Sequence, residues 1–585
     1  MKIKHLFGLA VIAAMTASCS SNEDLGTAGP STGTNEAGVG YATFTINLPS
    51  VSGTRADAGG AEMNEGTEEE YAVKSATALI FQKYGSDEGS YKFVESVTLP
   101  TAAADWTDDD TPGITTTSKK LVAKLTNVDT KNDYSVLILL NNDKTGGVKV
   151  ELPTVGESYN DWNNKVLTPS VAELAATGDF YMANAPLKGS AASPTTLVNI
   201  DNSKIYPTEE KAKTLESAAT VYVERGVAKM SVATPGTTGK ITVMDKAKPT
   251  VPTKSEVTFS NWALDITNKK TYAVHNIDGL KSNFDDIWTT PRFIGTNSRV
   301  YWGKDPNYSN NILKETDKDA ERKAEFNFID NTSKIDLDFD KSTYCLENTF
   351  NLANMYQGQT TRVIFKATYA PKADDAAGTS LADADDGTFY TIGNMTTILN
   401  TEKLKAAVNA VATPVLPIGY TIDYTNFKTK EGSHVITLAD IKDATGAALV
   451  GATSYNIGTS TKTGNDIVDD INAKLGLKAG RAEAMVGINT YLKGVTYYIA
   501  RVKHFGSLTP WKSGDSYGTD NATYLGRYGM LRNNWYELQV GNVYGPGYPG
   551  VPPVDPNQPD DENEKYLSVS VKILSWAKRS DTVDL

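Results

Sequence analysis

The sequence has very few of the side chains that hold metals or build disulfide frameworks. Its 585 residues include 2 cysteines and 4 histidines. Two cysteines exclude a disulfide scaffold and any multi-cysteine zinc site, and four histidines leave few ligands for other metals. No convincing signature of a serine nucleophile, a phosphate loop or a dinucleotide site is present. We therefore expect no cofactor and no enzymatic activity.

Positive charge and long apolar runs are also scarce. Lys and Arg number 57 against 70 Asp and Glu, a net charge of -13, with no local basic patch. This balance argues against a nucleic-acid partner, because phosphate backbones are repelled. No apolar run approaches the roughly 20 residues that span a bilayer. The length suggests about two to four globular domains.

Residues 1–19 have the pattern of a secretory signal peptide. Lys2 and Lys4 precede the apolar run Leu6 to Met15, and small residues lead to Cys19. This ending resembles a bacterial lipobox, so we expect acylation of Cys19, with palmitate among the chains, and a precursor anchored at the outer membrane. The alternative is a plain signal peptide in which Cys19 is incidental.

An isolated strand is predicted close behind the signal peptide. Apolar and polar residues alternate strictly over residues 42–48, which places four apolar side chains on one face of a strand: Ala42, Phe44, Ile46 and Leu48. Loose, glycine-rich segments lie on both sides, and the second contains Arg55. Because the strand has no local hairpin partner, it must pair with a distant part of the fold.

The rest of the chain reads as all-β with little helix. Short β-rich runs alternate with Gly, Asn, Asp and Pro clusters, a pattern typical of antiparallel sandwiches. The three best helical candidates are Lys211 to Ala219, Thr401 to Val411 and Asp466 to Leu475. A break at Asp245 to Ser255 suggests two sandwich domains, residues 56–250 and residues 251–545.

The C-terminal segment, residues 546–585, repeats the arrangement seen near the N-terminus. The Pro- and Gly-rich linker Tyr544 to Asp561 precedes another alternating strand. Its apolar face consists of Leu567, Val569, Val571 and Ile573. Because an unpaired apolar strand is a template for pairing, we expect both strands to be docked.

Two docked strands suggest a mechanism of assembly. If the N-terminal strand fills a groove in its own subunit, the C-terminal strand of a neighbour can replace it, by main-chain pairing and side-chain pockets. A head-to-tail contact that does not close produces a fibre. Cleavage at Arg55 would release the first strand. The alternative is that both strands are fixed parts of their own domains.

Several longer stretches resemble one family, the major fimbrial shaft subunits (fimbrillins) of Bacteroidales type V pili, in particular the short-fimbria class. They are Val223–Lys229, Tyr301–Tyr308, Tyr344–Phe350, Tyr497–Gly506 and Leu525–Tyr536. This resemblance implies two transthyretin-like β-sandwich domains, lipoprotein export, arginine-specific proteolysis and polymerisation by donor-strand exchange. It also implies adhesion, biofilm formation and virulence as the setting of the fibre.

The resemblance assigns roles to individual residues. Cleavage falls between Arg55 and Ala56, which makes residues 20–55 a propeptide with the displaceable strand at 42–48. The donor strand comprises Leu567, Val569, Val571 and Ile573, together with Trp576. The implied partners are identical subunits head to tail, anchor and tip subunits, an arginine-specific protease and the outer membrane.

Other interpretations compete with a shaft subunit. A monomeric surface lipoprotein could bind glycans or proteins through sandwich loops, with tryptophan platforms at Trp262, Trp288, Trp302 and Trp511. The charged group Glu224, Arg225 and Lys229 could suggest catalysis, but we expect exposed strand charges. We expect the acidic run Leu381 to Gly387 to be a solvated loop rather than a calcium site. Cys345 should be a buried free thiol.

Overall fold

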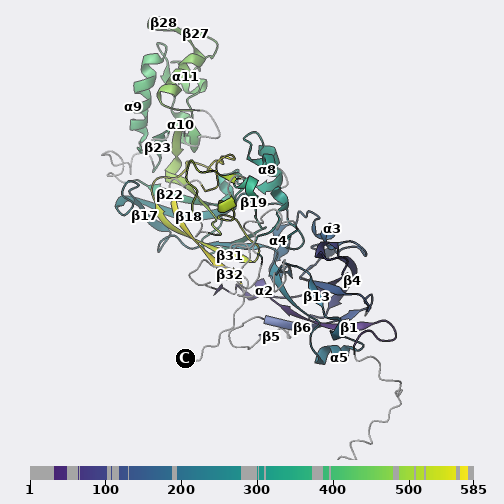
Figure 1. Cartoon of the computed structure of the whole chain (residues 1–585). Helices are drawn as coiled ribbons and strands as arrows, with labels where there is room; N and C mark the ends of the chain where they lie inside the picture. Colours follow the sequence, from purple (N-terminus) through teal and green to yellow (C-terminus); the bar gives the residue numbers. More distant parts are fainter. Residues whose placement is uncertain are drawn as a thin grey trace, which may run out of the picture.

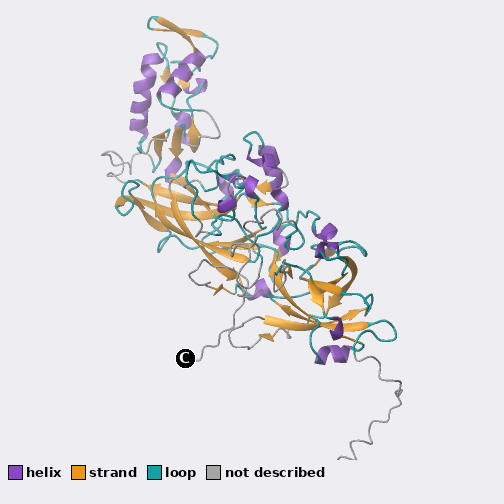
Figure 2. Ribbon diagram, in the orientation of Figure 1, coloured by secondary structure: helices purple, strands orange, loops and turns teal. Residues whose placement is uncertain are grey.

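The computed structural model describes most of the chain. The described residues are 32–48, 63–64, 66–101, 107–108, 117–129, 131–187, 194–278, 300, 302–308, 311–371, 386–393, 397–478, 486–505, 509–518, 522–561 and 567–576. Figure 1 shows an elongated arrangement, in which a first sheet, a second sheet and a helical region follow one another. Strands dominate the first two parts (Figure 2), which confirms the predicted all-β class with minor helix.

The first sheet has ten strands around one apolar core. Its order is β4-β3-β7-β12-β15-β1-β6-β5, and β13 and β14 pair with β7 and β1. The strands are β1 (Gly40–Asn47), β3 (Ala76–Gln82), β4 (Lys92–Leu99), β5 (Thr107–Asp108), β6 (Thr117–Leu125), β7 (Tyr134–Leu140), β12 (Met182–Asn184), β13 (Val198–Ile200), β14 (Ile205–Tyr206) and β15 (Ala219–Arg225). Every residue of β7 is buried, as expected for a central strand.

The first sheet curls so that distant strands meet. Glu95 of β4 accepts hydrogen bonds from the backbone N–H groups of Thr126 and Asn127, both at 3.0 Å, just after β6. Short elements complete this part: α2 (Glu68–Tyr71), α3 (Tyr159–Asn163), α4 (Val171–Leu174), α5 (Glu209–Thr214), β8 (Asp143–Lys144), β9 (Gly147–Val148), β10 (Ala175–Ala176) and β11 (Asp179–Phe180). The helix predicted over Lys211 to Ala219 begins earlier and ends at Thr214, because the backbone is already extended at Leu215, and Ala219 begins β15.

The second sheet has nine strands in the order β2-β32-β31-β17-β18-β22-β30, with β16 pairing both β31 and β21. Its strands are β2 (Met63–Asn64), β16 (Ala228–Val232), β17 (Lys240–Met244), β18 (Pro252–Asp265), β21 (Ser342–Cys345), β22 (Arg362–Ala370), β30 (Val495–Arg501), β31 (Asn534–Val543) and β32 (Leu567–Trp576). Near it lie β19 (Thr267–Asn268), β20 (Phe326–Asn327) and α8 (Asp319–Glu325). The chain therefore passes from the first sheet to the second at Gly226 and Val227. The segment Asp245 to Ser255, where the sequence suggested a break, instead follows β17 and forms the start of β18, and these two strands pair in the second sheet.

A third region, built around helices, projects from the second sheet at the end opposite the first sheet (Figure 1). It contains α9 (Thr401–Ala412), α10 (Thr425–Thr429), α11 (Gly464–Lys474), β23 (Phe389–Ile392), β24 (Thr421–Ile422), β25 (Gly432–His434), β26 (Ile441–Lys442), β27 (Ser454–Ile457), β28 (Ser460–Thr463) and β29 (Ile488–Tyr491). Leu404 and Val408 of α9 pack with Ile467 and Ile471 of α11 in its own core. Both helices were predicted, but the sequence did not reveal that they form a separate core.

None of the helices in the described part of the chain is long and apolar enough to cross a membrane.

Candidate functional site

The N-terminal strand β1 lies inside the first sheet rather than at its edge. It pairs antiparallel with β6 along its whole length, from Gly40↔Leu125 to Asn47↔Ser118. On its other side it pairs parallel with β15 from Phe44 to Asn47 and antiparallel with β14 at Tyr41 and Ala42. These partners are far away in the sequence, as the absence of a local hairpin partner predicted.

The apolar face of β1 is part of the core. The exposed fractions of Ala42, Phe44 and Ile46 are 0%, and that of Leu48 is 3%. All four belong to the apolar cluster of the first sheet. The predicted apolar face is therefore buried in the core, while Thr43 and Asn47 on the other face are buried as well, at 1% and 6% exposed.

The polar face of β1 is tied to the segment around α5. The hydroxyl of Thr43 donates to the carbonyl of Ala212, and the N–H of Ala218 donates to the carbonyl of Thr43 at 2.7 Å. Thr45 and Ser217 share a hydroxyl hydrogen bond of 2.7 Å. Removing β1 would therefore open the edges of β6 and β15, break side-chain hydrogen bonds and expose the apolar core.

The C-terminal strand β32 has a different setting. It pairs antiparallel with β31 from Asn534↔Ser575 to Val543↔Leu567. On its other side only the two residues of β2 pair with it, at Ser575 and Trp576. Thus β32 is docked on its own sheet, with most of one edge unpaired by any described strand. The structure does not bring β32 and β1 together, because they belong to different sheets.

Other predicted site residues lie outside the described residues. These are Cys19, Arg55, Ala56 and Trp288, and the acidic run Leu381 to Gly387 is described only at Asp386 and Gly387. The side chains of Leu567, Val569, Val571, Ile573 and Trp576 are likewise not described, although their backbone is that of β32.

Helix α2 is anchored to the second sheet through Glu70. Glu70 of α2 is 3% exposed and forms an ion pair of 2.7 Å with Lys229 of β16. It also accepts a hydrogen bond from the hydroxyl of Tyr344 in β21. The ammonium of Lys229 lies 3.5 Å from the ring centroid of Trp535. Glu70 therefore ties the segment that follows the predicted cleavage site to the second sheet.

The charges of the Val223–Lys229 stretch are buried, so the expectation of exposed strand charges is wrong. Glu224, Arg225 and Lys229 have exposed fractions of 2%, 0% and 3%. They occur where the chain passes from the first sheet to the second, so both faces are covered. Burial lowers the pKa of Arg225 to about 9, and its guanidinium donates to the carbonyl of Glu70 at 2.8 Å and to Asn533 at 3.2 Å.

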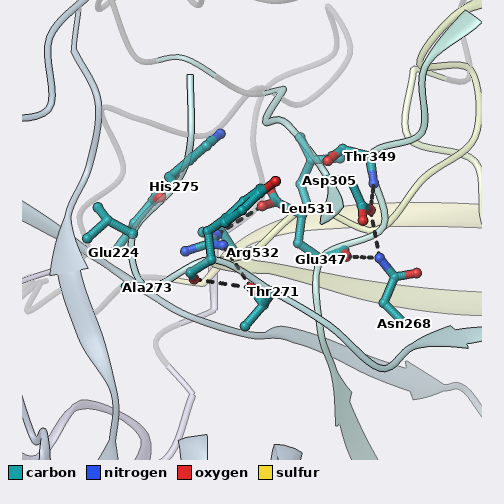
Figure 3. Close-up of polar contacts among 12 residues, drawn as sticks. Glu224, Asn268, Thr271, Ala273, His275, Asp305, Glu347, Thr349, Leu531 and Arg532 are labelled. Atoms are coloured by element: carbon teal, nitrogen blue, oxygen red, sulfur yellow. Dashed lines mark hydrogen bonds and ion pairs between the residues drawn. The ribbon is translucent and has the colours of Figure 1, made fainter. Parts of the chain in front are cut away.

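Further buried polar pairs extend this junction (Figure 3). The carboxylate of Glu224 lies 2.8 Å from Nδ1 of His275. Arg532 donates to Glu347 at 3.0 Å and to the hydroxyl of Thr271 at 3.3 Å. The ion pair between Arg532 and Glu347 is costly to break, since each charge would remain buried without its partner. The arrangement holds the two sheets together.

Asp305 and Asn268 lie beside these pairs in Figure 3. Asp305 accepts hydrogen bonds from Asn268, from the N–H of Thr349 at 3.0 Å and from the N–H of Asn307 at 2.9 Å. Burial nevertheless raises the pKa of Asp305 to about 6. Among the described residues no group of three or more His, Cys, Asp or Glu is arranged to hold a metal ion. These contacts position backbone segments.

The tryptophans proposed as glycan platforms differ in exposure. Trp262 and Trp302 are 0% and 1% exposed and belong to apolar cores, so they are not platforms. Trp511 is partly exposed. Cys345 is buried and free, as predicted, and burial raises the pKa of its thiol to about 12.

Sequence reasoning missed the residues that connect the parts of the chain. Glu70, His275 and Asp561 have no local signal, because their partners Lys229, Glu224 and Arg527 are distant in the sequence. A useful signal would have been the presence of charged residues in otherwise apolar strands, such as Glu224 in β15.

One family matches the end of the chain. Residues 489–582 match the sequence model described as "Major fimbrial subunit protein type IV, Fimbrillin, C-terminal". The matched region contains β30, β31 and β32, and it confirms the predicted resemblance to fimbrillins there. None of the curated proteins matches the chain.

Solved structures of fimbrial proteins are also similar to this chain. The tip fimbrial protein Mfa3 from Porphyromonas gingivalis, with C-terminal truncation, is 9% identical, with 92% of this chain and 100% of that chain covered and a TM-score of 0.28. A fimbrial assembly protein from Parabacteroides distasonis ATCC 8503 is 12% identical, with 56% of this chain and 81% of that chain covered and a TM-score of 0.26.

Proposed function

We propose that this chain is the polymerising shaft subunit of a cell-surface fimbria. It is exported as a lipoprotein acylated at Cys19, cleaved between Arg55 and Ala56, and assembled by donor-strand exchange. The fibre supports adhesion and biofilm formation. The observation that carries this proposal is β1, which pairs with β6 on one side and with β14 and β15 on the other and has its apolar face in the core.

The sequence of β32 supports the exchange. Leu567, Val569, Val571 and Ile573 repeat the alternation of Ala42, Phe44, Ile46 and Leu48. Polar residues lie between them in both strands. Since strand addition uses main-chain bonds for affinity and alternate side-chain pockets for register, β32 of one subunit has the pattern needed to replace β1 of the next.

The position of Glu70 supports cleavage as the trigger. Cutting after Arg55 separates β1 from the rest of the chain, whereas Glu70 keeps the following segment bound to Lys229 and Tyr344. The cut therefore frees the strand without loosening the junction. An arginine-specific protease, anchor and tip subunits and the outer membrane are the other partners in this proposal.

The monomeric glycan binder is less well supported. It needs exposed aromatic platforms, and both Trp262 and Trp302 are buried. It also gives no role to a central strand that belongs to a removable segment.

The direct test is N-terminal sequencing of protein sheared from cells and run without boiling on a denaturing gel. We expect a ladder of bands that all begin at Ala56. A single band with an acylated Cys19 would contradict the proposal, because the chain would then remain an uncleaved monomer.

A deletion of residues 566–585 tests the donor separately. It should leave secreted, folded and cleaved monomers, because the groove remains but no strand is available to fill it. Fibres of normal length from this deletion would exclude β32 as the donor.

A further inference from the structure

The proline-rich segment before β32 is hydrogen-bonded to the folded chain at its beginning, middle and end, although its composition predicted a linker. The hydroxyl of Tyr498 donates to the carbonyl of Gly545 at 2.8 Å, and that of Tyr491 donates to Gly547 at 3.0 Å. Tyr548 exchanges two backbone hydrogen bonds with Tyr497, of 2.7 and 2.9 Å. The first part of the segment is thus bound to β29 and β30.

Arg362 binds the middle of the segment. Its guanidinium donates to the carbonyls of Pro552 at 2.6 Å and Pro553 at 3.3 Å, and it is oriented by Asp265 at 2.8 Å. Prolines have no N–H but keep a carbonyl acceptor, so a fixed arginine suits such a stretch.

Two buried aspartates hold the end of the segment. Asp561 accepts hydrogen bonds from Arg527 at 2.8 Å, from the hydroxyl of Tyr528 at 2.9 Å and from the N–H of Trp511 at 2.6 Å. Its exposed fraction is 5%. Every one of these donors belongs to the folded domain, so Asp561 is a fixed point of the chain.

Asp560 binds a second set of partners at the same end of the segment. It is 2% exposed and accepts hydrogen bonds from the hydroxyl of Tyr517 and, at 3.2 Å, from that of Thr360. Its N–H donates to the carbonyl of Met355 at 3.2 Å. Burying two neighbouring carboxylates is costly unless both are hydrogen-bonded, which is the case here.

We propose that Asp560 and Asp561 are positioning residues of assembly: they fix the proline-rich segment to its own domain, so that the donor strand of each subunit starts from Asp561 and the joint between subunits is short and stiff. This proposal rests on the proposed function. Residues 562–566 separate Asp561 from Leu567, which limits the reach of the strand to about 20 Å. A free proline-rich tether from Tyr544 would reach about 70 Å.

The anchoring is tested first on the cleaved monomer, by hydrogen exchange. The double variant Asp560→Asn/Asp561→Asn should increase exchange over residues 544–561 by at least 10-fold. The control Asp336→Asn/Asp340→Asn makes the same charge change at two exposed aspartates and should leave exchange unchanged. Rapid exchange of this segment in the wild-type monomer would overturn the anchoring.

The joint is tested on assembled fibres by electron microscopy. The double variant should polymerise, but with at least a twofold shorter persistence length and a wider spread of subunit spacing. Tyr517→Phe, which removes one donor to Asp560 with little change in volume, should act in the same direction by less. Fibres as stiff as those of the control would overturn the proposal.

The experiments on the monomer and on the fibre distinguish failure of the proposed function from failure of the proposed joint. A wild-type chain that forms no fibre would overturn the proposed function and the joint together. Normal fibres whose stiffness does not depend on Asp560 and Asp561 would overturn only the joint.

Discussion

The two strands nearest the ends of the described chain have similar sequences and different surroundings. Both β1 and β32 alternate apolar and polar residues over seven or more positions. Yet β1 is paired on both edges, with β6 and with β14 and β15, whereas β32 is paired along one edge with β31 and only briefly with β2. One is a central strand, and the other is close to an edge strand.

This difference indicates which strand needs a trigger. Releasing β1 breaks two ladders and exposes Phe44, Ile46 and Leu48, each worth roughly 1.5 to 3 kcal/mol of burial. Releasing β32 breaks mainly one ladder. In the proposed mechanism, β1 leaves only after proteolysis has separated it from its subunit, whereas β32 leaves its edge without a cut.

Blocking the cut should have the largest effect. Arg55→Ala should abolish polymer and leave acylated precursor with β1 in place, because a covalently attached strand rebinds its groove at once. Arg55→Lys keeps the charge and should also block an arginine-specific protease. Gel ladders and N-terminal sequencing provide the measurement, and normal polymer from either variant would mean that the trigger lies elsewhere.

A charge on the apolar face of β32 should cause the second-largest loss of polymer. Val571→Asp should reduce polymer at least 100-fold, since a carboxylate would enter an apolar groove. Ser570→Asp is the matched control, because Ser570 is exposed in the resting strand and lies on the opposite face. It should change polymer by less than twofold. Equal effects of the two variants on the gel ladder would contradict the shared alternation of β1 and β32.

Truncating an apolar side chain of β1 should lower the stability of the uncleaved precursor but not that of the cleaved subunit after β1 has left. Phe44→Ala should lower the free energy of unfolding of the uncleaved chain by about 3 to 5 kcal/mol. Thr45→Val, on the other face, should cost less than about 1 kcal/mol. After cleavage and release of the strand the two variants should be identical. Chemical unfolding of both forms measures this, and a persistent difference would show that β1 stays bound.

The smallest expected effect is a dependence of the free energy of unfolding on pH. It should arise at Asp560, in the proline-rich segment before β32, and not at β1. Burial raises the pKa of Asp560 to about 6, with Arg501, Asp561 and Tyr517 as its charged or titratable neighbours. The folded state therefore holds this proton more tightly than the unfolded state. The contribution of protonated Asp560 to the free energy of unfolding is fully present below about pH 4. This contribution is lost as the pH rises through about 6, by at most about 1.4 kcal/mol per pH unit.

The measurement is the unfolding free energy at several pH values between 4 and 7. The difference between the wild type and Asp560→Asn should change over this range. A constant difference would contradict the raised pKa of Asp560.

Local pattern predicted many of the elements. The alternation of residues 42–48 predicted a strand with the correct buried face, and amphipathic spacing predicted α9 and α11 within two residues at each end. The buried faces were predictable because a period of two or 3.6 residues leaves few alternatives. The helix over Lys211 to Ala219 was predicted too far along the chain, since the backbone is extended from Leu215 and Ala219 belongs to β15.

Long-range contacts were not predictable in the same way. Glu224 and Lys229 were expected to face solvent, but they are buried and pair with His275 and Glu70, which are distant in the sequence. The segment Tyr544 to Asp561 had the composition of a free tether, but side chains from distant parts of the chain, among them Arg362, Arg527 and Tyr517, hold it in place.

The sequence by itself determined that the chain carries two strands with similar alternating patterns, one before Arg55 and one after the proline-rich segment. Alternation is a local property, and it survives whatever the strands pair with. Only the tertiary structure decided that β1 is locked between β6 and β15 while β32 rests on β31. Pairing depends on which edges distant segments leave open, and that is a property of the whole fold.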